Sequence, residues 1–249
     1  MAMTGGEHMS ADAVGIVTYS SAKRPGEPLQ ATRTSLIAAY GAQEVMQNPD
    51  CPYYGTVVIA AEQSYRVYPE STGHLLVADP RLSLAEGRQV EVITPARNRL
   101  LNTALQMAAL ARYSAERDLK SLHLFGWGFH EARVRTLFEA RSDVALSYTA
   151  VEDVLRTMDQ RKLNKFLGSI GMTVEFEDIM QRGIKTYAER EVGTSKVLLL
   201  GKSGWGYNFM TGVTGLGRYD DLNPDGTARK GKAWSPRTDD ALSEVAFVD

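Results

Sequence analysis

The fold is decided by residues 122–148, which read LHLFGWGFHEARVRTLFEARSDVALSY. Leu122–Trp127 is an apolar run typical of a buried strand, and Glu131–Ala140 has the apolar spacing of a helix. Val144–Tyr148 predicts a second strand, and Val151–Gly168 predicts one or two further helices. Strands that alternate with helices of about 10–20 residues are typical of parallel βαβ units, so the sequence predicts an α/β fold.

The segments that precede this unit continue the same pattern. Apolar runs bounded by turn residues predict strands at 14–19, 54–61, 74–78 and 89–94. Apolar positions at helical spacing predict helices at 29–47 and 97–117. Together these elements predict a largely parallel sheet with flanking helices.

The composition of the sequence and its pattern of predicted elements change after residue 170. Thr173–Phe176 and Lys196–Leu200 predict strands, and Asp178–Glu191 predicts a charged amphipathic helix. Residues 201–237 are rich in glycine, basic and aromatic residues, and an acidic tail follows. The predicted organisation is therefore a flexible tail (1–13), an α/β domain (14–170) and a less regular glycine-rich C-terminal lobe (171–249). No linker marks the boundary near 170, so the alternative is a single domain that includes the lobe.

Composition excludes several classes of protein. The 249 residues include 28 Lys and Arg against 30 Asp and Glu, 43% hydrophobic residues and a single cysteine. These values exclude a disulfide scaffold, a fibrous repeat and long disorder. The sequence has no apolar run long enough to cross a bilayer, and Met1–Ala13 lacks the apolar centre of a secretory signal. We therefore expect a cytoplasmic protein without a membrane partner.

The glycine-rich segment suggests a nucleic-acid interface. Residues 196–237 contain seven basic and three acidic residues, although the whole chain has a net charge of −2. Aromatic rings can stack on bases while Lys and Arg contact phosphates, so the segment predicts binding of RNA or single-stranded DNA. The candidate interface residues are Lys202, Trp205, Tyr207, Arg218, Tyr219, Lys230 and Lys232. The alternative is a glycine-rich hairpin region whose aromatic residues belong to an ordinary core.

The stretch Leu198–Gly217, with Gly201-Lys202-Ser203-Gly204-Trp205-Gly206 at its centre, resembles the glycine-rich loops of RAMP-type RNA-binding proteins from CRISPR effector complexes. The resemblance covers about twenty residues and implies an RNA-binding subunit of a ribonucleoprotein or defence complex. The chain departs from that family at residues 89–155, where strands alternate with helices, because RAMP-type proteins are built on antiparallel ferredoxin-like units.

A second hypothesis is a small-molecule transferase on a Rossmann-like sheet. His130 and Glu131 follow the strand 122–127, at the end where open α/β sheets bind ligands, and they are the candidates for proton transfer. Asp79, which follows the expected strand 74–78, is a further candidate carboxylate. Arg97 and Arg99 stand at the start of a predicted helix and could hold a phosphate. The structural alternative places His130 and Glu131 as first-turn residues of a helix, and the sequence leaves open whether the chain is an enzyme.

Two apparent ligand motifs are rejected. Gly201-Lys202-Ser203 lacks the earlier glycine of a phosphate-binding loop, since position 196 is a lysine. Asp221–Gly226 opens like a calcium loop, but Lys232 stands where the last ligand should be, and Asn223-Pro224-Asp225-Gly226 predicts a hairpin turn instead. The sequence thus predicts no metal site and identifies no cofactor. A third hypothesis is a structural subunit of a large assembly, such as a virus particle, with protein partners.

Overall fold

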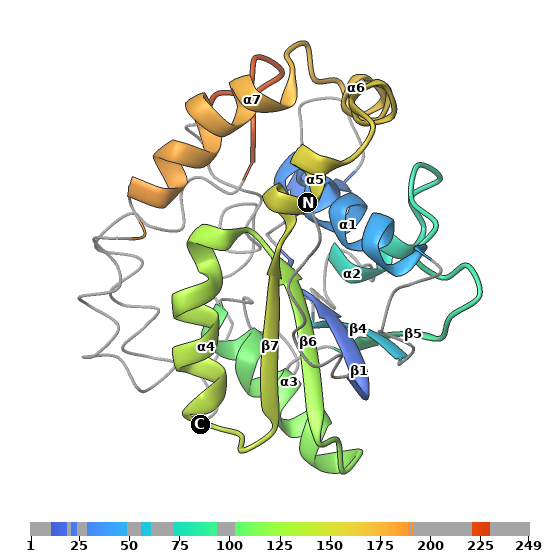
Figure 1. Cartoon of the computed structure of the whole chain (residues 1–249), viewed down its shortest axis with the longest axis vertical. Helices are drawn as coiled ribbons and strands as arrows, with labels where there is room; N and C mark the ends of the chain where they lie inside the picture. Colours follow the sequence, from blue (N-terminus) through green and yellow to red (C-terminus); the bar gives the residue numbers. More distant parts are fainter. Residues whose placement is uncertain are drawn as a thin grey trace, which may run out of the picture.

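The computed structural model describes residues 11–18, 21–23, 29–48, 56–60, 72–93, 103–189, 191 and 221–229. Within these residues, a five-stranded parallel sheet is covered by helices on both faces (Figure 1). The predicted α/β class with a parallel sheet is therefore confirmed. None of the helices in the described ranges combines the length and the hydrophobicity that a bilayer span requires.

The sheet is doubly wound. Its strands are β1 (Ala13–Ile16), β4 (Thr56–Ala60), β5 (Val90–Ile93), β6 (Ser121–Gly126) and β7 (Ala145–Ala150). They are arranged in the order β5-β4-β1-β6-β7, with Ile16 opposite Phe125 and Ala60 opposite Ile93. The chain moves outward from β1 through β4 to β5, then returns to β6 on the other side of β1. The carboxyl ends of β1 and β6 are thus neighbours at the point where the strand order reverses.

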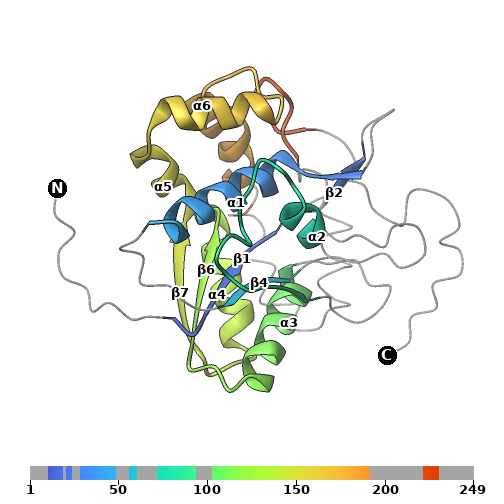
Figure 2. The same ribbon diagram turned by 90° about the vertical axis from the view of Figure 1, so that its right-hand side faces the viewer.

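Helices of two groups cover the two faces of the sheet (Figure 2). One face is covered by α1 (Arg33–Met46), α2 (Thr72–Val77) and α5 (Val151–Thr157). The other face is covered by α3 (Thr103–Glu116) and α4 (Glu131–Glu139). Alternation along the strands explains the division, because Val57 and Ile59 of β4 pack with α1 whereas Val58 packs with α3 and α4.

A two-stranded antiparallel hairpin lies between β1 and α1 in the chain. It consists of β2 (Ser21–Lys23) and β3 (Leu29–Ala31). The helix α1 begins directly after it, and Thr32 caps this helix by accepting a hydrogen bond from the backbone N–H of Ser35 through its side-chain oxygen. The helix predicted at 29–47 is therefore confirmed only from residue 33 onward.

A helical lobe stands beyond the carboxyl ends of the strands, in yellow and orange in Figure 1. It contains α6 (Gln160–Ser169) and α7 (Phe176–Ile179), which continues through a π-helical turn (Met180–Ile184) and helical residues 185–189. Phe176 and Ile179 are buried in the same hydrophobic cluster as α1. The lobe therefore shares a core with the first face of the sheet, and the domain boundary near residue 170 stays a prediction.

Residues 221–229 form the predicted hairpin turn and pack against this lobe. The backbone N–H of Gly226 donates to the carbonyl of Asn223 at 3.0 Å, and Leu222 bridges Ala228 across the turn. Gly226 has a φ of +79°, a left-handed conformation that favours glycine. The Asn-Pro-Asp-Gly turn is confirmed. The described residues contain no cluster of three His, Cys, Asp or Glu side chains that could hold a metal ion.

Two strand predictions are wrong. Residues 74–78 belong to the helix α2 and the turn after it, whereas residues 173–175 form an irregular link and Phe176 begins α7. A short apolar run has the same appearance in a strand and in a buried helix, so its period cannot separate the two. Leu76 of α2 is fully buried against the cluster around α1, and this packing explains the helix.

The predicted N-terminal tail ends earlier than residue 13. Ala13 is buried in β1, and the Asp12 carboxylate accepts hydrogen bonds from the backbone N–H groups of Lys120 and Ser121, at 2.7 and 3.0 Å. These hydrogen bonds lower the pKa of Asp12. The start of β1 is thus tied to the start of β6.

Candidate functional site

The reversal of strand order places a candidate site outside the carboxyl ends of β1 and β6. Doubly wound sheets bind ligands in the crevice at such a point. Val17, the residue after β1, donates its backbone N–H to the carbonyl of Phe125 at 2.8 Å, which holds the two strand ends together. The helices α3 and α4 both run back from this edge, so their N-terminal ends face the same region as the strand ends.

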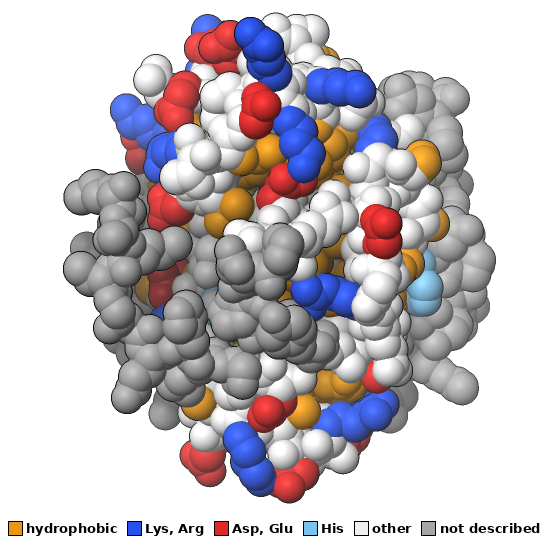
Figure 3. Space-filling model, turned by 45° about the vertical axis from the view of Figure 1, so that its right-hand side comes forward, with side chains coloured by type: hydrophobic (Ala, Val, Ile, Leu, Met, Phe, Trp, Pro, Cys, Tyr) orange, Lys and Arg blue, Asp and Glu red, His pale blue; other side chains and the backbone are white. Residues whose placement is uncertain are grey.

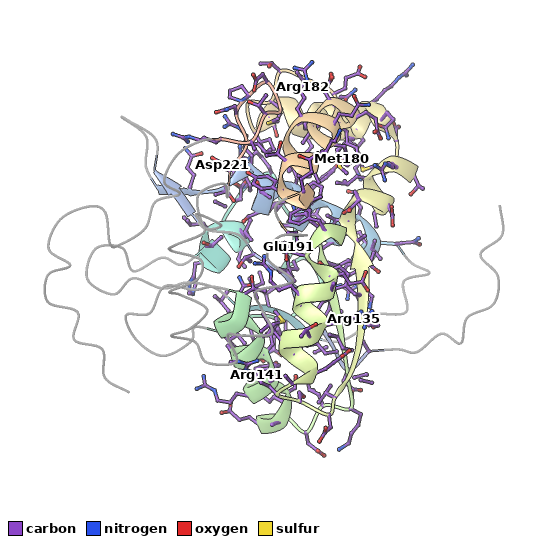
Figure 4. All side chains as sticks on the ribbon, turned by 90° about the vertical axis from the view of Figure 1, so that its left-hand side faces the viewer. Arg135, Arg141, Met180, Arg182, Glu191 and Asp221 are labelled. Carbon is purple, nitrogen blue, oxygen red and sulfur yellow. The ribbon has the colours of Figure 1, made fainter. Side chains whose placement is uncertain are left out.

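Three ionisable side chains meet at this edge, and we call His130, Arg133 and Glu191 the carboxyl-edge cluster. His130 ends the short 3₁₀ turn Gly128–His130 between β6 and α4, and Arg133 lies one helical turn further on. Arg133 Nε is 2.9 Å from Glu191 Oε1, and Arg133 Nη2 contacts His130 Nε2. Figure 4 shows Glu191 beside the N-terminal end of α4, below the helical lobe.

The protonation of His130 follows from its surroundings. Burial lowers the pKa of His130 well below its usual 6.5, and the positive charge of Arg133 acts in the same direction. Because a guanidinium offers only donors, His130 Nε2 accepts from Arg133, and the neutral ring carries its proton on Nδ1. Burial also raises the pKa of Glu191, while Arg133 opposes that shift. The cluster thus contains a cation, an acid and a neutral imidazole.

The turn that carries His130 is fixed by hydrogen bonds with residues of β7 and α5. The backbone N–H of Gly128 donates to both carboxylate oxygens of Glu152, at 2.9 and 3.0 Å. Tyr148 donates its hydroxyl to the carbonyl of Trp127 at 2.9 Å. A Cβ at Gly128 would lie 2.6 Å from Glu152 Oε1, so a larger residue there would displace the Glu152 carboxylate from its present position. The position of His130 is therefore set by contacts from neighbouring elements as well as by its own helix.

A second polar network closes the end of β1. Thr18 lies just after β1, and Ala60 is the last residue of β4. The Thr18 hydroxyl donates to the carbonyl of Ala60 at 3.1 Å. Gln106 of α3 donates through Nε2 to the Thr18 carbonyl and hydroxyl oxygens, at 2.8 and 2.9 Å. Both side chains are buried. This network joins two strand ends to the start of α3, on the side of β1 away from His130.

The structure separates the three proton-transfer candidates. His130 lies in the carboxyl-edge cluster, whereas Glu131 faces another side of α4 and pairs with Arg135 at 2.8 Å. Asp79 was a candidate because a strand was expected at 74–78, but it follows the helix α2 instead. Its carboxylate pairs with Arg81. The structure does not bring Glu131 or Asp79 to His130 as partners.

Sequence reasoning missed Arg133, Glu191, Thr18 and Gln106. Arg133 had a usable signal, because it lies three residues after His130 and so shares its helix face. Glu191 had no such signal in the sequence, since its contact with Arg133 depends on where the chain of the helical lobe runs. The spacing of residues along the chain cannot supply that path.

The other candidate residues lie outside the described ranges. Both phosphate-binding candidates, Arg97 and Arg99, belong to this group. The nucleic-acid candidates of the glycine-rich segment also belong to it: Lys202, Trp205, Tyr207, Arg218, Tyr219, Lys230 and Lys232. Their roles, and the strand predicted at 196–200, stay predictions.

Charge on the described surface is mixed. On the face drawn in Figure 3, Lys and Arg side chains alternate with Asp and Glu over the upper part of the molecule. The helical lobe itself carries ion pairs of opposite charges, including Arg156 with Glu177 at 3.3 Å and Arg182 with Asp178 at 3.3 Å. The described part of this face therefore carries no extended patch of a single sign.

These features define an α/β protein with a doubly wound parallel sheet and a buried charged cluster at its carboxyl edge. Comparison with known protein families, with curated proteins and with solved structures found no match to the chain. A functional assignment therefore rests on the fold and on the cluster.

Proposed function

We propose that the chain binds a phosphate-bearing small molecule at the carboxyl edge of its sheet and acts on it as a transferase. The observation that best supports this is the buried guanidinium of Arg133, in the first turn of α4 and directly beyond β6. Arginine matches the geometry of phosphate with two parallel hydrogen bonds, and a helix N-terminus adds positive potential. Both contributions act at the end of the sheet where this architecture binds ligands.

The roles within the cluster follow from charge. Arg133 would hold the phosphate and stabilise the negative charge that develops during transfer. His130 is poorly suited to act as a base near neutral pH, because its pKa is far below 6.5 and its Nε2 faces Arg133. We therefore assign His130 the role of orienting the guanidinium.

Replacing Arg133 with leucine should weaken binding of a phosphate ligand by roughly 10- to 100-fold, the value of one or two hydrogen bonds to a charged group. The probes are inorganic phosphate, AMP and coenzyme A, each titrated calorimetrically into the wild-type protein and the variant. Arg133→Lys keeps the charge but loses the planar fork, and should give an intermediate affinity.

The matched control is Arg135→Leu, which removes the same charge from the same helix. Arg135 pairs with Glu131, and its side chain is about one-third exposed. Figure 4 labels Arg135 further along α4 than Glu191. The affinity of the Arg135→Leu variant for the probes should stay close to that of the wild type. Equal losses in both variants, or no binding of any probe by the wild type, would contradict the proposal.

A second candidate function is binding of RNA or single-stranded DNA as a subunit of a ribonucleoprotein. Its support is the excess of basic and aromatic residues in 196–237. Three charged residues of that segment are described. Arg229 Nη1 lies 3.7 Å from Asp221 Oδ2, so these two offset each other, and the third, Asp225, is exposed and acidic. The remaining positive charge belongs to residues such as Lys202 and Arg218.

Replacing both Lys202 and Arg218 with alanine should weaken binding of a labelled single-stranded RNA and flatten its salt dependence. Loss of two phosphate contacts should reduce the slope of log K against log salt by about 1.4. Fluorescence anisotropy between low and moderate salt measures this slope. The control removes two exposed cations of the described region, Arg112 and Lys120, which should leave the slope unchanged. An unchanged slope in the Lys202 and Arg218 variant would remove this assignment.

A further inference from the structure

We infer that Glu191 is a specificity-determining residue of the proposed phosphate site, because its carboxylate occupies the part of Arg133 that the phosphate of a ligand would take. The inference rests on the proposed function and deepens it. It predicts that Glu191 acts as a competing anion, and that only a ligand with a stronger negative charge displaces it.

The contacts of Arg133 support this competition. Arginine binds a carboxylate or a phosphate through parallel N–H groups on one edge of its fork. In this structure Nε lies 2.9 Å from Glu191 Oε1, and Nη2 on the same edge contacts His130. Glu191 Oε2 lies 4.0 Å from His130 Nε2, so the carboxylate covers the junction of both residues. Glu191 Oε1 meets Nε as an ion pair without a hydrogen bond, so a phosphate that binds through Nε must compete with the negative charge of Glu191.

The helix that carries Glu191 is anchored close to the site. Tyr187, one turn before Glu191, donates its hydroxyl to the carbonyl of Asp221 at 2.6 Å. The ring of Tyr187 also stacks on Phe129 of the β6–α4 turn, with ring centres 5.9 Å apart. These contacts fix the helix on both the hairpin and the turn. Displacement of Glu191 therefore requires movement of its side chain, and the lobe can stay in place.

Competition with a carboxylate defines the class of ligand. Glu191 carries at most one negative charge, whereas a phosphate monoester carries between about 1.5 and 2 at pH 7. A carboxylate ligand offers Arg133 the same charge as Glu191 and gains nothing by exchange. A phosphate monoester gains the additional charge, so the site should select terminal phosphate groups over carboxylates.

The test compares Glu191→Gln with Glu189→Gln, which removes the same charge from an exposed position of the same helix. Inorganic phosphate and acetate are titrated calorimetrically into the two variants and the wild type at pH 7.5. Glu191→Gln should bind phosphate about 10-fold more tightly than the wild type and should also acquire measurable acetate binding. Glu189→Gln should behave as the wild type. Circular dichroism spectra establish that all three proteins are folded.

The outcomes separate this inference from the proposed function. Phosphate binding that is equal or weaker in Glu191→Gln than in the wild type overturns the competing role of Glu191, while the phosphate site itself remains. Absence of phosphate binding in the wild type and in both variants overturns the proposed function and this inference with it. Phosphate binding by Glu191→Gln alone supports the competing role of Glu191, because it shows a site that the native carboxylate fills.

Discussion

Replacing Asp221 with alanine is expected to lower the free energy of unfolding by about 3–5 kcal/mol, the usual cost of removing one partner from a buried charged network. Asp221 is only 3% exposed, although it belongs to a hairpin near the end of the described chain. Its Oδ1 accepts hydrogen bonds from the backbone N–H of Arg33 at 2.7 Å and of Leu222 at 2.9 Å. Alanine would leave both donors buried without an acceptor.

The consequences extend through Arg33, the first residue of α1. Its guanidinium donates from Nε to the carbonyl of Ile170 at 3.0 Å and from Nη1 to the carbonyl of Leu222 at 2.9 Å. These bonds join α1, the end of α6 and the hairpin, so Asp221 and Arg33 together attach the helical lobe to α1. The helix that carries Glu191 contacts the same hairpin through Tyr187. Loss of Asp221 should therefore also loosen the carboxyl-edge cluster.

Urea denaturation followed by circular dichroism measures this effect as a fall in the midpoint at an unchanged slope. Asp225→Ala in the same hairpin is the control. Asp225 is exposed and its carboxylate accepts hydrogen bonds from Thr227 of the same turn, so its replacement should change the midpoint little. Equal midpoints for the two variants would show that the Asp221 network does not stabilise the fold.

Lowering the pH from 7 to 4 is expected to cost the protein roughly 3 kcal/mol of stability through His123 alone. Burial lowers the pKa of His123 from 6.5 to about 4, and the nearby charge of Arg135 adds to the shift. His123 is a buried sheet-face residue, and its ring nitrogens hydrogen-bond to Ser147 at 2.7 Å and Thr149 at 3.0 Å on β7.

The direction of the effect follows from which state binds the proton. Below pH 6.5 the unfolded chain protonates His123, while the folded protein keeps the ring neutral until the pH approaches 4. Protons therefore bind preferentially to the unfolded state in this window, and stability falls as the pH falls. The full contribution of the neutral His123 ring to the free energy of unfolding is present above pH 6.5 and is lost by about pH 4.

His123→Gln removes the titration but keeps a side chain that can hydrogen-bond to the same hydroxyls. The free energy of unfolding of this variant should fall less between pH 7 and pH 4 than that of the wild type, by roughly 3 kcal/mol. Urea titrations at several pH values measure both curves. Parallel curves would mean that His123 titrates normally in the folded protein. The comparison is needed because His130, whose pKa is also lowered, contributes to both curves.

Much of the secondary structure could be predicted from the sequence. The strands predicted at 122–127 and 144–148 and the helix at 131–140 are confirmed as β6, β7 and α4, because their apolar periods differ clearly. Residues 74–78 could not be assigned in this way, since a run of five residues is too short to show a period. The helix there follows from the burial of Leu76, which depends on α1.

The candidate site was predictable only in part. The sequence by itself determined the α/β class, and it placed His130 after a buried strand, where a carboxyl edge had to be. Only the tertiary structure decided the strand order, and with it the point where β1 and β6 lie side by side. It also decided that Arg133 meets Glu191 and that Asp221 meets Arg33. The physical reason is that local periodicity depends on near neighbours in the chain, whereas buried charges take their partners from elements that packing brings together.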